Sequence, residues 1–262
     1  MAGACPIEFI ELAERLAAAS GEVIRRHFRT PFAIEQKSDA TPVTIADREA
    51  ERVMRELIAE TFPGHGILGE EHGSDRIDAE HVWVLDPIDG TRAFIAGKPI
   101  FGTLISLTQN GAPILGVIDQ PVNGERWVGA VGVQTRFNGE DVTTRPCASL
   151  DRAILNSTSP DMFEGGDLTR FRNIAAASHD VLYGGDCYAY GLLASGFIDL
   201  VVEADLKPYD FCALAPVVEG AGGSITDWRG QGLTLESDGR IVASGDPSLH
   251  AQAIESLDFG GN

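Results

Sequence analysis

The most constraining feature of the chain is residues 83–91, with the sequence WVLDPIDGT. An apolar run ends there in two aspartates three residues apart, with a proline between them. Val82 to Leu85 is typical of a short buried strand. Because Pro87 cannot donate to a strand ladder and fixes its own φ, we expect the strand to stop there. Asp86 and Asp89 are then predicted at its carboxyl end, on a stiffened turn.

These residue types favour a metal and phosphate site on the turn. Two carboxylates held this close repel each other unless a cation lies between them. Hard divalent ions such as Mg²⁺ prefer oxygen ligands, and the carbonyl of Ile88 can supply another. Gly90 allows close approach of a backbone N–H to a ligand, and the Thr91 hydroxyl can bond a water or a phosphate oxygen. The alternative is an Asx-type turn that caps the next segment.

Composition narrows the classes of partner. With 20 Lys plus Arg against 39 Asp plus Glu, the chain of 262 residues carries a net charge of −19. This balance argues against nucleic acid and against an anionic membrane surface as a partner. Four scattered cysteines without a C-x-x-C pair favour free thiols in a reducing compartment. With neither a secretory signal nor a transmembrane stretch apparent, a cytoplasmic location is expected. The alternative is an organellar protein that has lost a transit peptide.

The first half combines helices with antiparallel strands. Apolar residues at helical spacing predict a helix over residues 6–28, and Thr44 opens a second that extends to Phe62. A short strand is expected over residues 66–73. Residues 100–145 are predicted to be an antiparallel meander, because the Asn-Gly pairs at 110–111 and 138–139 are hairpin signals.

The second half alternates strands and helices. Strands are expected at 153–157, 181–183, 198–203, 224–227 and 241–244, and helices near 166–177, 186–196, 209–221 and 247–257. Such alternation predicts α/β layering. Composition shifts near residues 143–146. We therefore predict an α+β half over residues 1–145 that carries most metal ligands, and an α/β half over 146–262 that carries substrate residues and one metal ligand.

Further acids stand at the ends of expected elements: Asp47, Glu70 and Asp210. Each has a structural interpretation, namely a capping box of Thr44 with Asp47, a solvated strand end at Glu70, and a helix N-cap at Asp210. Together with the turn, they suit a site where two or three Mg²⁺ ions neutralise a phosphate and activate a water.

These motifs resemble the inositol monophosphatase superfamily in order and approximate spacing, over nearly the whole chain. The matching segments are Lys37, Thr44-x-x-Asp47, Gly69-Glu70-Glu71, Asp86 to Thr91, Asp210 and residues 219–223. The resemblance implies a five-layered αβαβα sandwich.

The resemblance also implies roles for individual residues. Glu70, Asp86 and the Ile88 carbonyl would bind one Mg²⁺, and Asp86, Asp89 and Asp210 a second. Glu70 and waters would hold a third. Asp47 and Thr91 would orient and deprotonate the attacking water, which makes them catalytic together with Glu70. Gly90 and Thr91 would contact the phosphate through backbone N–H groups, and Lys37 would lie near the metals.

Other segments resemble the histidinol-phosphate phosphatase branch of the superfamily, although Lys207-Pro208-Tyr209-Asp210 departs from the Trp-Asp of many relatives. The branch-like segments are residues 92–103, 118–121, 125–127 and 184–190. Asp186 and Glu203 fall where the family contacts the alcohol part of the substrate. Carboxylates suit the ammonium and imidazole of histidinol, since a charge-assisted contact contributes about 1.5–3 kcal/mol. The alternative for Asp186 is a helix N-cap.

The expected activity is therefore Mg²⁺-dependent hydrolysis of L-histidinol phosphate, a step of histidine biosynthesis, by in-line attack of water. Alternative small phosphate monoesters are inositol monophosphates, 3′-phosphoadenosine 5′-phosphate and fructose 1,6-bisphosphate. A non-catalytic regulatory protein with the same fold is a further alternative. By analogy with the family, a homodimer is expected.

Overall fold

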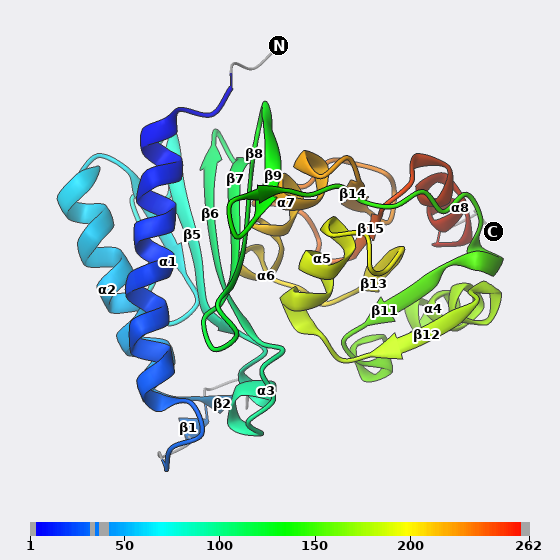
Figure 1. The fold of residues 1–262 in the computed structure, drawn as a ribbon, viewed down its shortest axis with the longest axis horizontal. Helices are drawn as coiled ribbons and strands as arrows, with labels where there is room; N and C mark the ends of the chain where they lie inside the picture. The colour runs from blue at the N-terminus through cyan, green and yellow to red at the C-terminus, as the bar shows by residue number, and fades with distance from the viewer. Residues whose placement is uncertain (1–3, 32–34, 37–41, 258–262) are drawn as a thin grey trace.

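The chain folds into five layers, as Figure 1 shows for the computed structural model, which describes residues 4–31, 35–36 and 42–257. Helices α1 and α2 form one outer layer, and an eight-stranded sheet lies beside them. Helices α5, α6 and α7 form the middle layer. A five-stranded sheet and then helices α4 and α8 complete the order. The predicted αβαβα sandwich is confirmed.

The larger sheet has the strand order β10-β9-β8-β7-β6-β5-β3-β4. All neighbours are antiparallel except β3 and β5, which pair in parallel from Gly66 opposite Val82 to Gly69 opposite Leu85. Its strands are β3 (Gly66–Gly69), β4 (Gly73–Asp75), β5 (His81–Asp89), β6 (Gly102–Gln109), β7 (Ala112–Gln120), β8 (Glu125–Ala130), β9 (Val133–Phe137) and β10 (Glu140–Asp141).

Two amphipathic helices cover the outer face of this sheet, α1 (Ile7–His27) and α2 (Ile45–Thr61). Both bury the apolar stripe that the sequence predicts; Leu12, Leu16 and Met54 are fully buried among sheet residues such as Trp83. A short hairpin, β1 (Glu35–Gln36) and β2 (Pro42–Val43), connects the helices and lies beside α3 (Thr91–Ile95).

The smaller sheet has the order β12-β11-β13-β15-β14. Its outer face carries α4 (Gly165–Ala177) and α8 (Pro247–Leu257). The strands are β11 (Ile154–Ser157), β12 (Asp180–Tyr183), β13 (Leu200–Glu203), β14 (Ser224–Asp227) and β15 (Ile241–Ser244), and the short 3-10 turns are η1 (Leu150–Arg152) and η2 (Pro160–Met162).

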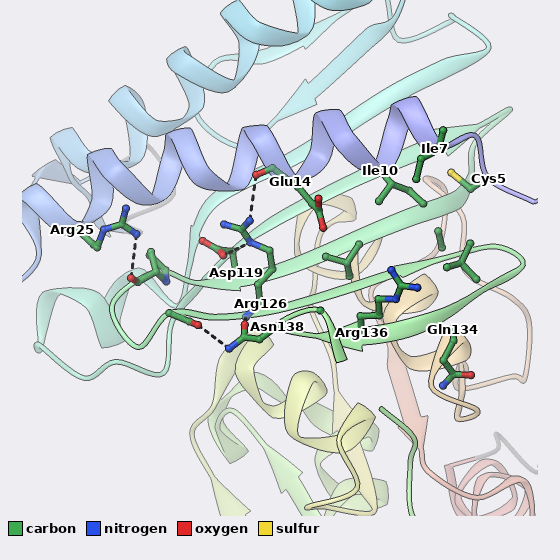
Figure 2. A pocket seen from close by; sticks show the side chains of 16 residues that line it. Cys5, Ile7, Ile10, Glu14, Arg25, Asp119, Arg126, Gln134, Arg136 and Asn138 are labelled. Atoms are coloured by element: carbon green, nitrogen blue, oxygen red, sulfur yellow. Dashed lines mark hydrogen bonds and ion pairs between the residues drawn. The ribbon is translucent and has the colours of Figure 1, made fainter. Parts of the chain in front are cut away.

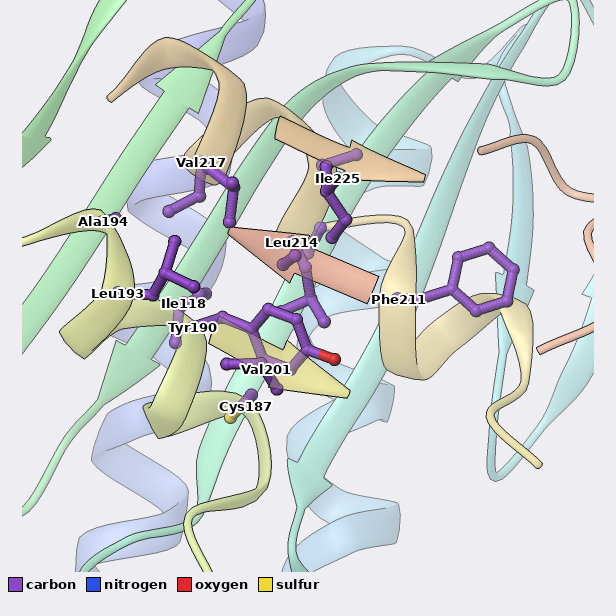
Figure 3. Close-up of a cluster of buried hydrophobic side chains, with 14 of the residues drawn as sticks. Ile118, Cys187, Tyr190, Leu193, Ala194, Val201, Phe211, Leu214, Val217 and Ile225 are labelled. Carbon is purple, nitrogen blue, oxygen red and sulfur yellow. The ribbon is translucent and has the colours of Figure 1, made fainter. Parts of the chain in front are cut away.

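The middle layer joins the two sheets through α5 (Asp186–Ala194), α6 (Pro208–Phe211) and α7 (Leu214–Gly220). Their side chains fill the core drawn in Figure 3. Helix α7 and the residue before it approach β7 and β8 closely. A Cβ at Gly129 would collide with the backbone of α7, and one at Gly116 with the backbone of Ala213. These glycines therefore set the distance between the middle layer and the larger sheet.

The meander, its Asn-Gly turns and both outer helices match the predictions, but the expected end of the strand at Pro87 is wrong. Strand β5 continues to Asp89, with a register shift between Asp86 opposite Leu104 and Asp89 opposite Gly102. Pro87 lies within this bulge, so it need not donate to the ladder. Its carbonyl instead accepts the Thr103 hydroxyl at 2.8 Å.

The predicted single helix over residues 209–221 is also wrong, because the chain forms α6 and α7 with Cys212 and Ala213 between them. Pro216 explains the interruption. It has no N–H to donate to the carbonyl four residues earlier, that of Cys212, so a continuous helix would lose a bond there. The sequence prediction overlooked this proline, and also the short strand β4.

All described strands of the larger sheet precede residue 145, and those of the smaller sheet follow it. Because α5 and α7 contact strands of both sheets, the division into two domains stays a prediction. No helix within the described ranges is long and apolar enough to cross a membrane.

Candidate active site

Parallel pairing of β3 and β5 brings the first two acids together. Carboxyl ends of parallel strands meet at one edge of a sheet, so Glu70 follows β3 beside the point where β5 reaches Asp86. The Glu70 N–H donates to the Leu85 carbonyl at 3.1 Å. Glu70 acts on Asp86 as a neighbouring negative charge and as a hydrogen-bond partner. Two of the predicted metal ligands therefore lie side by side.

Three predicted ligands from both halves of the chain converge at this edge. Asp86 and Asp89 come from the end of β5, and Asp210 from α6. One carboxylate oxygen of each lies within 4.8 Å of the other two. This is the only such group of three or more potential ligands in the described part of the chain.

Burial raises the pKa of Asp86 well above its ordinary value, and the charges of Glu70, Asp89 and Asp210 raise it further. Burial likewise raises the pKa of Asp89, with Asp186 and Asp210 adding to the effect. For Asp210, burial raises the pKa to about 7, against the opposing effect of a backbone bond. Carboxylates that raise each other's pKa in this way need either protons or a cation between them.

Backbone N–H groups hold each of these carboxylates by one oxygen. Ile88 N donates to Asp86 Oδ1 at 2.9 Å, and Lys207 N donates to Asp210 Oδ2 at 2.7 Å. Cys187 N donates to Asp89 Oδ2 at 2.5 Å and so ties the turn to α5. The Asx-type turn considered for Asp86 is therefore present, and it orients the carboxylate. Asp210 is the third residue of α6, so the N-cap interpretation is wrong.

Asp47 is fully buried at the start of α2. Its hydrogen bonds show whether an oxygen is left over for a polar ligand. Thr44 donates to Asp47 Oδ2 through its N–H at 2.8 Å and its hydroxyl at 2.5 Å, so the predicted capping box is confirmed. Asp47 Oδ1 has no hydrogen-bond partner. Burial raises the pKa of Asp47, the Thr44 bonds lower it and Glu70 raises it. A buried carboxylate oxygen without a donor suits a bound water beside hydrated cations.

Glu51 supports the site from α2, and the sequence analysis did not identify it. Its buried carboxylate pairs with Arg55 at 2.7 Å and accepts the N–H groups of Glu71 at 2.7 Å and His72 at 3.1 Å. Gly69 leaves room for this contact, since a Cβ there would collide with Glu51. Glu51 therefore fixes the turn that carries Glu70. One feature of the sequence could have identified Glu51: it is an acidic residue at an inward-facing position of the helix, and its neighbours Ala50 and Met54 are buried too.

The residues predicted to bind the alcohol part of the substrate lie beside two of the predicted metal ligands. A cavity of about 60 Å³ is lined by Asp89, Asp210, Asp186 and Glu203, together with Thr158, Met162, Cys187, Tyr190, Leu206 and Leu214. Asp186 is the first residue of α5 and makes no capping bond, so its N-cap interpretation is wrong. Burial raises the pKa of Asp186 to about 6, while Lys98 and Arg92 lower it.

Glu203 is the last residue of β13 and lines this cavity. Its Oε1 accepts Thr158 N at 3.0 Å and its Oε2 accepts the Tyr190 hydroxyl at 2.9 Å. Burial raises the pKa of Glu203 to about 7, although both bonds oppose the rise. The side chain is thus fixed in one orientation, and burial favours its protonated form more than in an exposed glutamate.

Gly90 and Thr91 follow the ligands directly. Gly90 has φ of 85°, and a Cβ there would lie 2.7 Å from Asp186 Oδ2, so only glycine fits between turn and α5. The Thr91 hydroxyl donates to the Ile88 carbonyl at 3.1 Å. Lys37, which was predicted near the metals, lies outside the described residues.

A larger cavity of about 580 Å³ lies elsewhere, between α1 and strands β7 to β9, as Figure 2 shows. Three of its charged groups are engaged by the chain itself: Arg126 pairs with Asp119 at 2.7 Å and also donates to the Glu14 carbonyl, and Arg25 donates to the Pro121 carbonyl. Size alone therefore does not identify the reaction site. The convergence of Asp86, Asp89 and Asp210 is the better guide, because three carboxylates this close together suit a divalent cation.

Comparisons with known proteins agree with this geometry. The model of the inositol monophosphatase family matches residues 6–261. The chain is 51% identical over 260 residues to the chloroplastic bifunctional phosphatase IMPL2 of Arabidopsis thaliana, covering 96% of this chain and 75% of that protein. It is 34% identical to the histidinol-phosphatase of Chlorobaculum parvum, covering 90% and 92%. An inositol monophosphatase structure from Zymomonas mobilis superposes with a TM-score of 0.89 at 50% identity, over 95% and 97%.

Proposed function

This chain belongs to the inositol monophosphatase family and is a phosphatase, and from that premise we propose that it hydrolyses L-histidinol phosphate to L-histidinol and phosphate with Mg²⁺. The observation that carries the chemistry is the convergence of Asp86, Asp89 and Asp210 within 4.8 Å. Oxygen ligands of this kind are those that Mg²⁺ takes in phosphate sites.

The metal set consists of Glu70, Asp86, Asp89 and Asp210 with the Ile88 carbonyl. When bound there, divalent cations supply neutralisation of phosphate charge and a lowered pKa of water. The backbone bonds to Asp86, Asp89 and Asp210 hold these carboxylates in place before any ligand arrives. Binding therefore requires little rearrangement of the chain.

Asp47 and Thr91 prepare the attacking water. Asp47 Oδ1 accepts a proton from the water, while Thr44 keeps the carboxylate oriented through Oδ2. The Thr91 hydroxyl donates to the Ile88 carbonyl, which leaves its oxygen lone pairs free to accept a hydrogen bond from the second O–H of the water and so to orient it. Ile88 packs in one cluster with Ala46, the neighbour of Asp47, so the two segments are adjacent. Gly90 and Thr91 offer N–H groups to the phosphate.

Asp186 and Glu203 support histidinol as the alcohol. Both carboxylates line the cavity beside Asp89 and Asp210, and a cationic alcohol group suits them better than a neutral polyol. The likeness to histidinol-phosphatases supports this choice. Mg²⁺ as the ion, a homodimer and a cytoplasmic location complete the proposal; the Arabidopsis relative is named as chloroplastic.

A phosphate-release assay with histidinol phosphate and myo-inositol 1-phosphate in parallel tests the substrate. We expect kcat/KM to favour histidinol phosphate by at least about tenfold, which is one charge-assisted contact or more. Asp186→Ala should raise KM for histidinol phosphate much more than KM for a neutral sugar phosphate. Equal changes for both substrates would contradict cation recognition by Asp186. Release from none of a panel of phosphate monoesters would indicate a non-catalytic role.

Inositol monophosphate is the second candidate, because the Zymomonas mobilis structure at 50% identity is that of an inositol monophosphatase. The same parallel assay separates the two. A preference for myo-inositol 1-phosphate, with Asp186→Ala affecting both substrates alike, would favour this candidate.

A further inference from the structure

Three basic side chains gather around α3, directly after the metal turn. Arg92 is the second residue of α3, Lys98 follows the helix, and Arg29 reaches over from the end of α1. We call Arg29, Arg92 and Lys98 together the cationic collar. The chain has only 20 basic residues against 39 acids, so three of them in one place form a local exception.

Arg29 fixes the loop that carries Lys98. Its Nε and one terminal nitrogen donate to the Gly97 carbonyl at 3.0 and 2.8 Å, and its guanidinium lies 5.1 Å from the ring of Phe28. Lys98 N donates back to the Ala93 carbonyl at 2.9 Å, so the loop folds onto α3. Phe28 also packs on Phe94 of that helix, with ring centroids 5.7 Å apart. These contacts therefore hold Arg29 and the loop that carries Lys98 against α3.

Two members of the collar, Arg92 and Lys98, lie near Asp186 at the edge of the reaction site. A Cβ at Gly90 would touch Asp186 Oδ2, so Asp186 lies directly beside the start of α3. Lys98 and Arg92 are close enough to Asp186 for their positive charges to act on its carboxylate. Both side chains are exposed, and neither forms an ion pair with another described residue.

This placement answers an electrostatic difficulty. A phosphate monoester is a dianion near neutral pH, whereas the protein carries a net charge of −19 and the site is lined by carboxylates. Without nearby cations, long-range repulsion would lower the local concentration of substrate. Positive groups beside the site that are not committed to ion pairs oppose this repulsion.

We propose that Arg92 and Lys98, positioned by Arg29, recruit the phosphate group of the substrate to the carboxylate site. The inference rests on the proposed phosphatase site but not on the identity of the alcohol. It assigns the collar to the entry of the substrate anion and not to the chemical step.

The test compares two double variants that change the net charge equally. Arg92→Gln with Lys98→Gln removes the collar charges, while Arg15→Gln with Arg172→Gln removes two exposed charges from the outer helices α1 and α4. A third double variant, Arg92→Lys with Lys98→Arg, keeps the collar charges. The readouts are kcat/KM for p-nitrophenyl phosphate and the inhibition constant of inorganic phosphate, so the test does not depend on histidinol.

At low salt, where the screening length is about 30 Å, the neutral collar variant should lose about tenfold in kcat/KM and weaken phosphate inhibition similarly. At about 1 M salt, where that length is about 3 Å, the loss should shrink below about twofold. The outer-helix and charge-keeping variants should remain near wild type. An equal loss at both salt concentrations, or no loss at low salt, would overturn the proposal.

Failure of the collar and failure of the proposed substrate are distinguishable. A protein that prefers myo-inositol 1-phosphate would still show the salt-dependent loss. Conversely, the protein could hydrolyse histidinol phosphate while its neutral collar variant behaves like the outer-helix variant. That result would support the proposed function and contradict the role of the collar.

Discussion

At the scale of single residues, aspartates of the proposed reaction site are held by the chain through one of their two oxygens. Backbone N–H groups hold one oxygen of Asp86, Asp89 and Asp210, and Thr44 holds one oxygen of Asp47. The second oxygen of Asp47 has no partner in the chain. A side chain fixed through one oxygen presents the other in a defined direction, which is the preorganisation that phosphate hydrolysis needs.

Asp89→Asn tests the metal role of this residue. The amide oxygen can still accept the Cys187 N–H, so the fold should persist, while the negative charge that attracts a cation is lost. We expect kcat to fall on the order of a thousandfold or more, with an unchanged circular dichroism spectrum. Activity close to wild type in this variant would contradict the assignment of Asp89 as a ligand.

The stability of the metal-free protein should depend on pH through the buried acids. Burial raises the pKa of Asp210 and Glu203 to about 7 in the folded state. Because these values exceed those of the unfolded chain, about 4, the folded state binds more protons, and the resulting stability is lost as pH rises through about 7.

Chemical denaturation in the presence of a chelator, between about pH 5 and pH 8, measures this effect. The free energy of unfolding should fall with rising pH. Asp210→Asn should flatten the slope, because the amide does not titrate. Saturating Mg²⁺ should flatten it as well. A metal-free protein that is more stable at the higher pH would refute the description of these acids.

At the scale of elements, parallel pairing of β3 with β5 is what places Glu70 beside Asp86. The sequence predicted each strand end but not their pairing, since no residue pattern distinguishes a parallel from an antiparallel neighbour here. The Asn-Gly turns were predictable because they require positive φ, and Asn110 and Gly111 have φ of 50° and 82°. The grouping of Asp86, Asp89 and Asp210 was predictable because D-P-x-D-G-T and the separated acids form a motif.

Predictions failed where tertiary contacts override local rules. Pro87 was expected to end β5, but the bulge provides it with a position that needs no N–H. Glu51 carried no local signal of its contact with the turn after β3, because that contact joins residues 20 positions apart. Asp186 resembled an N-cap, yet α5 begins with it at φ of 46° beside Gly90. Such contacts depend on the packed structure.

Glu51→Ala should weaken metal binding, although Glu51 is not one of the proposed metal ligands. The variant removes the acceptor for the N–H groups of Glu71 and His72, so the turn that carries Glu70 loses its support. We expect the Mg²⁺ concentration for half-maximal activity to rise about 10- to 100-fold, as for other outer-shell partners. Glu51→Gln keeps an acceptor and should lie between Glu51→Ala and wild type. An unchanged Mg²⁺ requirement in Glu51→Ala would show that Glu51 has no part in placing Glu70.

At the scale of the whole molecule, the reaction site joins the two sheets. Asp86 and Asp89 belong to the larger sheet, whereas Asp210, Asp186 and Glu203 belong to the other half of the chain. The linker between the halves is fixed as well, because Arg145 pairs with Asp199 at 2.6 and 2.7 Å. A cation bound between Asp89 and Asp210 therefore connects both halves.

Calorimetric unfolding should show a single transition that Mg²⁺ shifts upward as a whole. A site occupied at about one hundred times its Kd stabilises the folded state by about 2.7 kcal/mol per bound ion. Two transitions, of which Mg²⁺ moves only one, would show instead that the halves unfold independently and that the cation contacts one of them.

Anomalous diffraction from crystals soaked in Mn²⁺ is the most direct test of the proposed metal site, because it locates bound cations without reference to activity. We expect one anomalous-difference peak between Asp86, Asp89 and Asp210, and a second between Glu70, Asp86 and the Ile88 carbonyl. Crystals of active protein that bind Mn²⁺ elsewhere and show no peak at these carboxylates would contradict it.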